Sequence, residues 1–167
     1  DTARAKGYTG KGVTIALIDG TVDTSAPELK GANIIDKSRC TIEAAPKDRG
    51  HGTAMASYLV APAYGVARDA TLLAYQMSTD DSKSAGSCNI GGDRLDTYDQ
   101  IINQAIDDGA QIISISVGAP ETDDSIKWAI ARAMSRSVII VNSAGNEGKD
   151  SNANQLSRWS GVVGVSA

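Results

Sequence analysis

Several residue types and patterns are scarce in this sequence, and each scarcity argues against a class of protein. Histidine occurs once and cysteine twice, without Cys-x-x-Cys spacing, which argues against a zinc site. No apolar run approaches the roughly 20 residues that cross a bilayer, so no membrane span is expected. Lysine and arginine do not cluster and the net charge is −4, which argues against nucleic acid as a partner because phosphate binding requires a basic surface.

What is present indicates a globular protein. Hydrophobic residues make up 41% of the 167 residues and charged residues 22%, and neither a linker nor a repeat is visible, so we expect residues 1–167 to belong to one domain. Cys40 and Cys88 lie in polar, loop-like stretches, where a disulfide would suit an exported protein; two unrelated free thiols are the alternative. The chain opens without a signal peptide, which fits a processed product, a cut chain or a cytosolic protein.

Strand-like and helix-like segments alternate along the chain. Short β-branched and apolar runs predict six buried strands, at 13–18, 33–35, 71–77, 111–116, 138–141 and 161–166. Helical periodicity predicts three helices, at 53–61, 95–108 and 123–135, with Gly109 as a C-cap and Asp123 and Asp124 at an N-terminus. The fold class is therefore α/β, with a parallel sheet covered by helices on both faces in three layers. The stretch 78–93, rich in Ser, Gly and Asp, predicts one long surface loop.

Three polar motifs stand out in this pattern: 18–23 (IDGTVD), 50–53 (GHGT) and 143–148 (SAGNEG). Each has an ordinary explanation, since Asp19-Gly20 could be only a turn, His51 only a residue at a helix start and Asn146 only a turn former. Reactive groups in parallel sheets gather at the carboxyl ends of the strands. Because the three motifs occur together in this order, we interpret them as one catalytic site.

These motifs resemble those of the subtilase family of serine peptidases. Further matching segments are 7–13 (GYTGKGV), 51–57 (HGTAMAS), 64–72 (YGVARDATL) and 115–118 (ISVG), so the resemblance covers nearly the whole chain. It implies a subtilisin-like fold and roles for individual residues. His51 would be the general base, Asp19 would hold its tautomer and stabilise the imidazolium, and Asn146 would donate to the oxyanion.

The resemblance also implies a binding surface for an extended peptide or protein substrate. Ser116, Val117 and Gly118 would pair with its backbone, and Ala144 and Gly145 would contribute small residues to the wall of a side-chain pocket. Asp23 is left open between a catalytic-motif acid and a residue that caps or solvates the turn. The substrate itself is not indicated.

The largest departure from the family is the missing nucleophile. The family's serine lies in a Gly-Thr-Ser-Met-Ala motif beyond the oxyanion asparagine, and no such motif occurs here. The similar run Gly52–Ser57 directly follows His51 and belongs to the histidine motif, so Ser57 is interpreted as helix packing. We expect residues 1–167 to be the N-terminal portion of a divided peptidase domain whose serine lies on a C-terminal chain, a partner that would cover an otherwise unpaired sheet edge.

Two smaller departures concern subfamily and cofactors. The order Asp-Gly-Thr, where the family has Asp-Ser/Thr-Gly, is similar to subtilases that mature ribosomal peptides, such as the cyanobactin proteases. The stretch between His51 and Gly65 is shorter than in secreted subtilisins, so no calcium ion, and no other metal or cofactor, is expected there. Asp80 and Asp81 could hold calcium weakly, although solvated acid is the commoner explanation.

The expected activity is therefore peptide-bond hydrolysis through an acyl-enzyme. The alternative is a pseudopeptidase or peptide-binding fragment that kept the cleft without the nucleophile. A nucleotide-binding protein of the same fold class is disfavoured, because the sequence after Ile18 is acidic and poor in glycine. We expect a secreted or extracytoplasmic protein, with a cytoplasmic one as the alternative.

Overall fold

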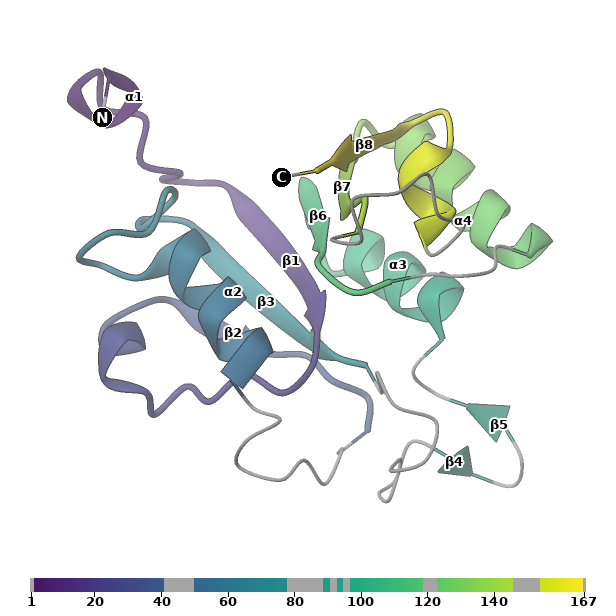
Figure 1. Ribbon diagram of the computed structural model, residues 1–167, viewed down its shortest axis with the longest axis horizontal. Coiled ribbons are helices and arrows are strands. Elements are labelled where there is room, and N and C mark those ends of the chain that lie inside the picture. Colours follow the sequence, from purple (N-terminus) through teal and green to yellow (C-terminus); the bar gives the residue numbers. More distant parts are fainter. Residues whose placement is uncertain are drawn as a thin grey trace.

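The computed structural model describes residues 2–40, 50–77, 89–90, 93–94, 97–118, 123–145 and 154–166, and its centre is a six-stranded parallel sheet (Figure 1). In the order in which they neighbour one another, its strands are β2 (Ile34–Asp36), β3 (Thr71–Gln76), β1 (Thr14–Asp19), β6 (Ile112–Ile115), β7 (Ile139–Ser143) and β8 (Val162–Val165). After β1 the chain forms β2 and β3 on one side of β1, and then β6, β7 and β8 on the other side. The end of β1 is therefore the point where the strand order reverses, the usual place of a binding crevice in such sheets.

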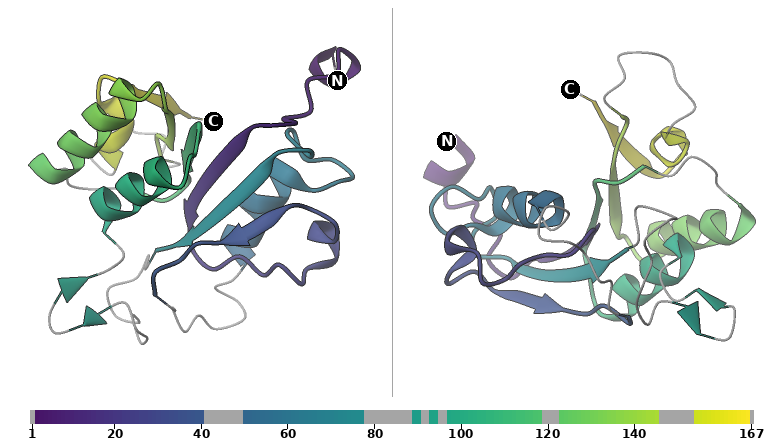
Figure 2. Two further views of the ribbon diagram at one scale, coloured as in Figure 1. Left: turned by 180° about the vertical axis from the view of Figure 1, so that it is seen from behind. Right: turned by 60° about the horizontal axis from the view of Figure 1, so that its bottom comes forward.

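Helices lie on both faces of this sheet, so the expected three-layer α/β/α fold is confirmed. Helix α2 (Gly50–Val60) covers one face, and α3 (Tyr98–Asp107) and α4 (Asp124–Ser135) cover the other (Figures 1 and 2). A hydrophobic core lies on each face of the sheet, and β1 contributes alternate side chains to the two: Ile15 and Leu17 pack with α2, whereas Ala16 and Ile18 pack with α3. Strands buried on both faces explain why their sequences are continuously apolar.

The six strands lie where the sequence predicts them, within one or two residues at each end. Two of the helix ends are also as expected. The side chain of Asp123 accepts a hydrogen bond from the backbone N–H of Ile126 and caps α4, and Gly109 follows α3 with a left-handed φ of +87°. The prediction for α2 was wrong at its start, because the helix begins at Gly50 rather than at residue 53 and so includes His51 in its first turn.

The remaining elements are short. They are the helix α1 (Thr2–Ala5), the 3-10 turns η1 (Pro27–Leu29) and η4 (Leu156–Arg158), and the strands β4 (Asn89–Ile90) and β5 (Asp93–Arg94). The stretch 78–93, which the sequence predicts to be one long surface loop, includes β4 and the first residue of β5, which pair antiparallel. Across the described ranges, no helix is long and apolar enough to cross a membrane.

The face of the sheet that carries α2 is only partly covered. Ile139 on β7 and Val163 and Val165 on β8 point to this face, and each has about half of its surface exposed, between 51% and 52%. Helix α2 packs over β1 and β3 instead. The β7–β8 part of this face is therefore an apolar surface that the described residues leave open to solvent.

Candidate active site

A buried carboxylate and an exposed imidazole meet at the carboxyl end of the sheet. Asp19, the last residue of β1, is 1% exposed, whereas the side chain of His51, in the first turn of α2, is 57% exposed. His51 Nδ1 lies 2.8 Å from Asp19 Oδ1. A carboxylate can only accept, so Nδ1 carries the proton and the ring's other nitrogen is left as a base. The sequence predicts that these two residues act as a pair, and the structure places them in contact; their roles as acid and base stay a prediction.

Close backbone packing brings the two residues together. A Cβ on Gly52 would lie 2.6 Å from the carbonyl oxygen of Gly20 and 2.8 Å from that of Thr21, so only glycine lets the start of α2 approach the chain after β1. The hydroxyl of Thr53 then accepts a hydrogen bond from the backbone N–H of Asp23 at 2.9 Å. Both residues that follow His51 therefore tie it to the segment that follows Asp19.

Asp23 has a structural role in this segment. Its Oδ1 accepts hydrogen bonds from the backbone N–H of Ser25 at 2.9 Å and from the Ser25 hydroxyl at 2.6 Å. This is the turn-capping explanation that the sequence left open. Ser57, one helical turn after Thr53, is buried and donates to the carbonyl of Ala54, as expected for helix packing rather than for a nucleophile.

The two oxygens of the Asp19 carboxylate have different surroundings. Oδ1 accepts from His51 and also from the backbone N–H of Gly20, at 2.6 Å. Oδ2 is buried and has no hydrogen-bond partner among the described residues. In the part of the chain that the structure describes, the carboxylate is thus anchored through Oδ1 alone, an uncommon state for a buried acid.

A buried asparagine supports the predicted substrate segment from behind. Asn142, near the end of β7, has no exposed surface, and its Nδ2 donates to the carbonyl of Ile115 at 2.9 Å and that of Val117 at 3.4 Å. The predicted substrate residues Val117 and Gly118 are partly or fully exposed on the other side. The sequence analysis did not single out Asn142; the signal was a polar residue closing a buried strand.

A second residue missed from the sequence is Tyr98, the first residue of α3. Its hydroxyl donates to the carbonyl of Gly118 at 2.6 Å. Burial, and secondarily the negative charge of Asp19, raise the pKa of this phenol, so it stays a donor at neutral pH. Asn142 and Tyr98 together fix the chain that leaves β6.

The segment after β7 carries the other predicted binding residues. The backbone N–H of Ala144 donates to Val165 of β8 at 2.7 Å, and Gly145 has a left-handed φ of +105° that favours glycine. The amide of Asn154, 3% exposed, donates to the carbonyl of Ser143. Asn146, the predicted oxyanion donor, lies outside the described residues.

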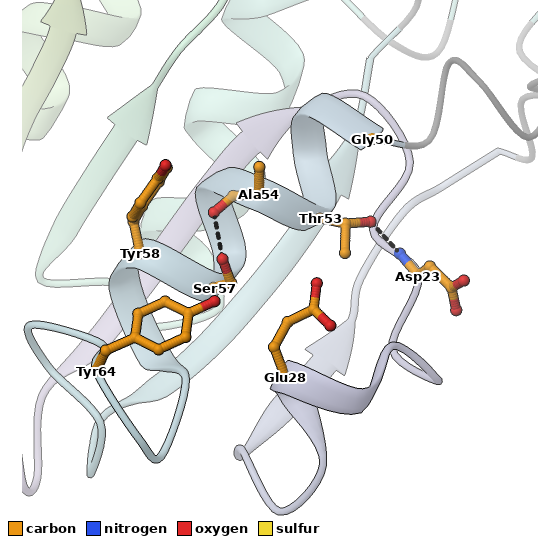
Figure 3. A pocket seen from close by; sticks show the side chains of 8 residues that line it. All are labelled: Asp23, Glu28, Gly50, Thr53, Ala54, Ser57, Tyr58 and Tyr64. Atoms are coloured by element: carbon orange, nitrogen blue, oxygen red, sulfur yellow. Dashed lines mark hydrogen bonds between the residues drawn. The ribbon is translucent and has the colours of Figure 1, made fainter.

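A pocket of about 490 Å³ opens between η1 and α2, and neither Asp19 nor His51 lines it. Figure 3 shows Glu28 of η1 facing α2 across it; the lining is Asp23, Glu28, Gly50, Thr53, Ala54, Ser57, Tyr58 and Tyr64. None of these is a predicted site residue except Asp23, whose role the sequence left open, so the pocket lacks the predicted catalytic and substrate-binding residues. Within the described ranges, His, Cys, Asp and Glu side chains do not gather in threes as metal ligands would.

Of the two cysteines in the predicted disulfide, the structure describes Cys40 but not Cys88. Cys40 is buried and disulfide-bonded. The sequence has one other cysteine, Cys88, which lies outside the described residues. Asp80 and Asp81, the other candidates for a calcium site, lie outside them as well.

Comparison with known proteins agrees with this geometry. The subtilase family profile (peptidase S8) matches residues 10–167. The major intracellular serine protease of Bacillus subtilis (strain 168) is 34% identical over 154 residues, which cover 86% of this chain and 46% of that protein. Subtilisin E of the same organism is 31% identical over 157 residues, covering 86% and 37%. The chain thus spans less than half the length of these relatives.

Solved structures show the same fold. The prenylagaramide maturation protease PagA is 26% identical with a TM-score of 0.68, over 88% of this chain and 50% of that one. An S218A mutant of the protease domain of PatA has a TM-score of 0.76 at 24% identity, over 94% and 58%. The Asp19–His51 geometry, the parallel sheet and the family match over almost the whole chain lead to one conclusion: the chain belongs to the subtilase family of serine proteases.

Proposed function

We propose that this chain supplies the acid, the base and one oxyanion donor of a serine endopeptidase. The observation that carries the proposal is the 2.8 Å contact between Asp19 Oδ1 and His51 Nδ1, in which the acid is buried and the imidazole is open to a reactant. Imidazole, with an intrinsic pKa near neutrality, is suited both to accept and to return a proton. Asn146 follows Gly145 directly and is the proposed side-chain donor to the oxyanion.

The proposed reaction needs a serine from outside these 167 residues, which contain no Gly-Thr-Ser-Met-Ala motif. His51 takes the hydroxyl proton as the serine oxygen attacks the peptide carbonyl, and returns it to the leaving amine as the C–N bond breaks. A water molecule, activated by His51 in the same way, then hydrolyses the acyl-enzyme. Asp19 keeps the Nδ1 proton in place and stabilises the imidazolium formed in each half-reaction.

The exposed apolar face of β7 and β8 is an argument for a partner polypeptide that packs there and carries this serine. Ile139, Val163 and Val165 are half-exposed apolar side chains on one continuous face of the sheet. Covering such a surface is favourable, at about 25 cal/mol for each Å² of apolar surface buried. A serine-bearing polypeptide that packs here would share a sheet face with His51 and could present its hydroxyl to the imidazole.

The proposed substrate is an extended peptide segment. Beyond β6, the backbone of Ser116, Val117 and Gly118 is available to pair with it, and the carbonyls held by Asn142 and Tyr98 preorganise this edge. The likeness to PagA, a maturation protease at 26% identity, favours a precursor peptide as the substrate class. We propose no metal or other cofactor for the reaction.

The disulfide, rather than the relatives, is the basis on which we propose a cellular compartment for this protein. One relative is named as an intracellular protease and another, of the same organism, as an extracellular one. The bonded state of Cys40 favours an oxidising compartment. We therefore propose an exported protein.

Labelling with a fluorophosphonate probe tests the proposed function. The probe is applied to the native preparation, which is then separated under denaturing conditions and analysed by intact mass. We expect label on a serine-bearing polypeptide, and loss of that label when His51→Ala replaces the parent chain. Absence of label from every polypeptide, with retained binding of an extended peptide, would favour the pseudopeptidase instead.

A further inference from the structure

Tyr98 is bonded to the proposed substrate segment, residues 116–118. It is the first residue of α3, and its hydroxyl donates to the carbonyl oxygen of Gly118 at 2.6 Å. The ring of Tyr98 is partly buried against the core under α3 and α4, whereas Gly118 is exposed. An exposed backbone acceptor on the edge that is predicted to bind a peptide is therefore occupied by a side chain of the protein itself.

Two carbonyls of this segment, those of Ser116 and Gly118, are not directed at β7. Asn142 of β7 donates to the carbonyls of Ile115 and Val117, so these two point toward β7. Carbonyl groups of successive residues point to opposite sides of an extended strand, so the carbonyl of Ser116 points to the side on which β1 lies. The carbonyl of Gly118 is directed to α3 by its hydrogen bond to that helix. These two carbonyls are the acceptors that a peptide can use.

A peptide that pairs with these two carbonyls takes a place in line with β1. The last registered pair between β1 and β6 is Ile18 with Ile115. The chain after Asp19 then turns to the start of α2 and does not accompany the segment that follows β6. A peptide on this side lies next to the strand end where Asp19 meets His51, as a reacting peptide must. Burial, and secondarily the charge of Asp19, raise the pKa of the Tyr98 phenol, which agrees with a position at the same strand end.

We propose that Tyr98 is a specificity-determining residue whose hydroxyl competes with a peptide N–H for the carbonyl of Gly118. The proposal rests on the proposed function, because it concerns the same peptide-binding edge. The bond orders the segment in the free protein, and a peptide that pairs only with Ser116 leaves it intact. A longer peptide displaces the hydroxyl into water before its own N–H can bond, so it loses part of the gain from the added pairing. Tyr98 thus discriminates between peptides by their length.

Sharing of the carbonyl is the arrangement to be distinguished from competition. An oxygen with two lone pairs can accept from the hydroxyl and from a peptide at once. In that case the hydroxyl would not weaken the binding of a longer peptide. Removal of the hydroxyl alone separates the two arrangements, and Tyr98→Phe does so while keeping the ring that packs against the core.

The probes are acetylated alanine peptide amides, in a series from the dipeptide to the pentapeptide. Their dissociation constants are measured by isothermal titration calorimetry on the native preparation, with His51→Ala in every sample so that no peptide is cleaved. In Tyr98→Phe we expect about fivefold tighter binding of the peptides long enough to reach Gly118, which is the net contribution of one hydrogen bond, and unchanged binding of the shorter ones. An N-methyl group on the peptide nitrogen that faces Gly118 removes the donor, so this gain should vanish at one position of an N-methyl scan and persist at the others.

Tyr8→Phe is the matched control. Tyr8 lies between α1 and β1 with 70% of its surface exposed, and removal of its hydroxyl should leave the dissociation constants unchanged at every length. Thermal unfolding of each variant separates a local change from loss of the fold. Equal affinities of the parent and Tyr98→Phe at every length would overturn the proposal. Weaker binding of the longer peptides by Tyr98→Phe would overturn it too, because the bond would then only support the segment.

The outcome is separable from the proposed function. Calorimetry needs no nucleophile, so failed fluorophosphonate labelling together with the length-dependent gain would refute the peptidase activity and leave the competition intact. Successful labelling without the gain would do the reverse. If no alanine peptide binds to either variant, the peptide-binding edge itself is refuted, and the competition with it.

Discussion

Replacing Gly52 by alanine should pull His51 away from Asp19. The added Cβ would lie 2.6 Å from the carbonyl oxygen of Gly20, 2.8 Å from that of Thr21 and 3.0 Å from the carbonyl carbon of Gly20. All three contacts are to backbone, so no flexible side chain can give way. The first turn of α2 must move instead, and it carries His51.

The size of the movement follows from these distances. Ordinary van der Waals contact begins at 3.4 Å, so relieving the 2.6 Å contact needs a shift of about 0.8 Å. Along the line between the two groups, this shift would take the 2.8 Å bond between His51 and Asp19 past the usual hydrogen-bond range of about 3.2 Å. We expect overpacking to lower the free energy of unfolding by about 1–3 kcal/mol. A displacement approaching 1 Å should lower kcat by about 10²-fold.

Gly50→Ala is the control on the same helix. A Cβ there meets nothing within 4 Å, so we expect unchanged or slightly higher stability, by about 0.5–1 kcal/mol. Both variants are compared by urea unfolding and by turnover of a peptide substrate in the assembled enzyme. If Gly52→Ala matches Gly50→Ala in both assays, close backbone approach does not place His51, and the reasoning is refuted.

Four further outcomes are expected. Asp19→Asn should lower kcat by about 10⁴-fold, measured at saturating substrate, because an amide favours the wrong histidine tautomer; a loss below tenfold would contradict this role. Asn142→Ala should lower the free energy of unfolding in urea by about 1–3 kcal/mol, since the buried carbonyl of Ile115 loses its donor, and equal stability would contradict it. Burial raises the pKa of Tyr98, and burial together with the hydrogen bond to the Asp108 carboxylate raises the pKa of Tyr75, so the stabilisation from these phenols should be fully present below the ordinary tyrosine pKa of about 10 and be lost at higher pH. Tyr75→Phe should therefore make the free energy of unfolding fall less steeply between pH 9 and 11. An identical slope in the parent and the variant would contradict this. Removal of divalent metals with EDTA should leave turnover in the assembled enzyme unchanged, and a loss restored by calcium would show that a metal site is needed.

Short stretches of the sequence are enough to predict much of this fold. Continuous apolar runs such as 13–18 and 111–116 predict strands buried on both faces, because only a sheet covered by two layers of helices needs them. Asp123 and Gly109 mark helix ends through backbone chemistry that acts locally. The Asp, His and Asn motifs, taken together, predict the family, which the match over residues 10–167 confirms.

The start of α2 shows where local reasoning fails. Gly50, His51 and Gly52 are poor helix formers, so the sequence predicts a helix only from residue 53. In the structure the helix begins at Gly50, and Gly52 sits tightly against the backbone of Gly20. Tertiary packing overrides propensity here, and the same contact places His51 beside Asp19.

The sequence by itself determined which side chains are candidates for the proposed chemistry, because residue type decides what can accept, donate or hold a proton. Only the tertiary structure decided how they are held. Strand order sets β1 between β3 and β6, so residues almost 100 positions apart, Asp19 and Ser116, become neighbours. The support that Asn142 gives to the carbonyl of Ile115 depends on a hydrogen bond between strands, and such a bond is defined by register and burial, which no local pattern encodes.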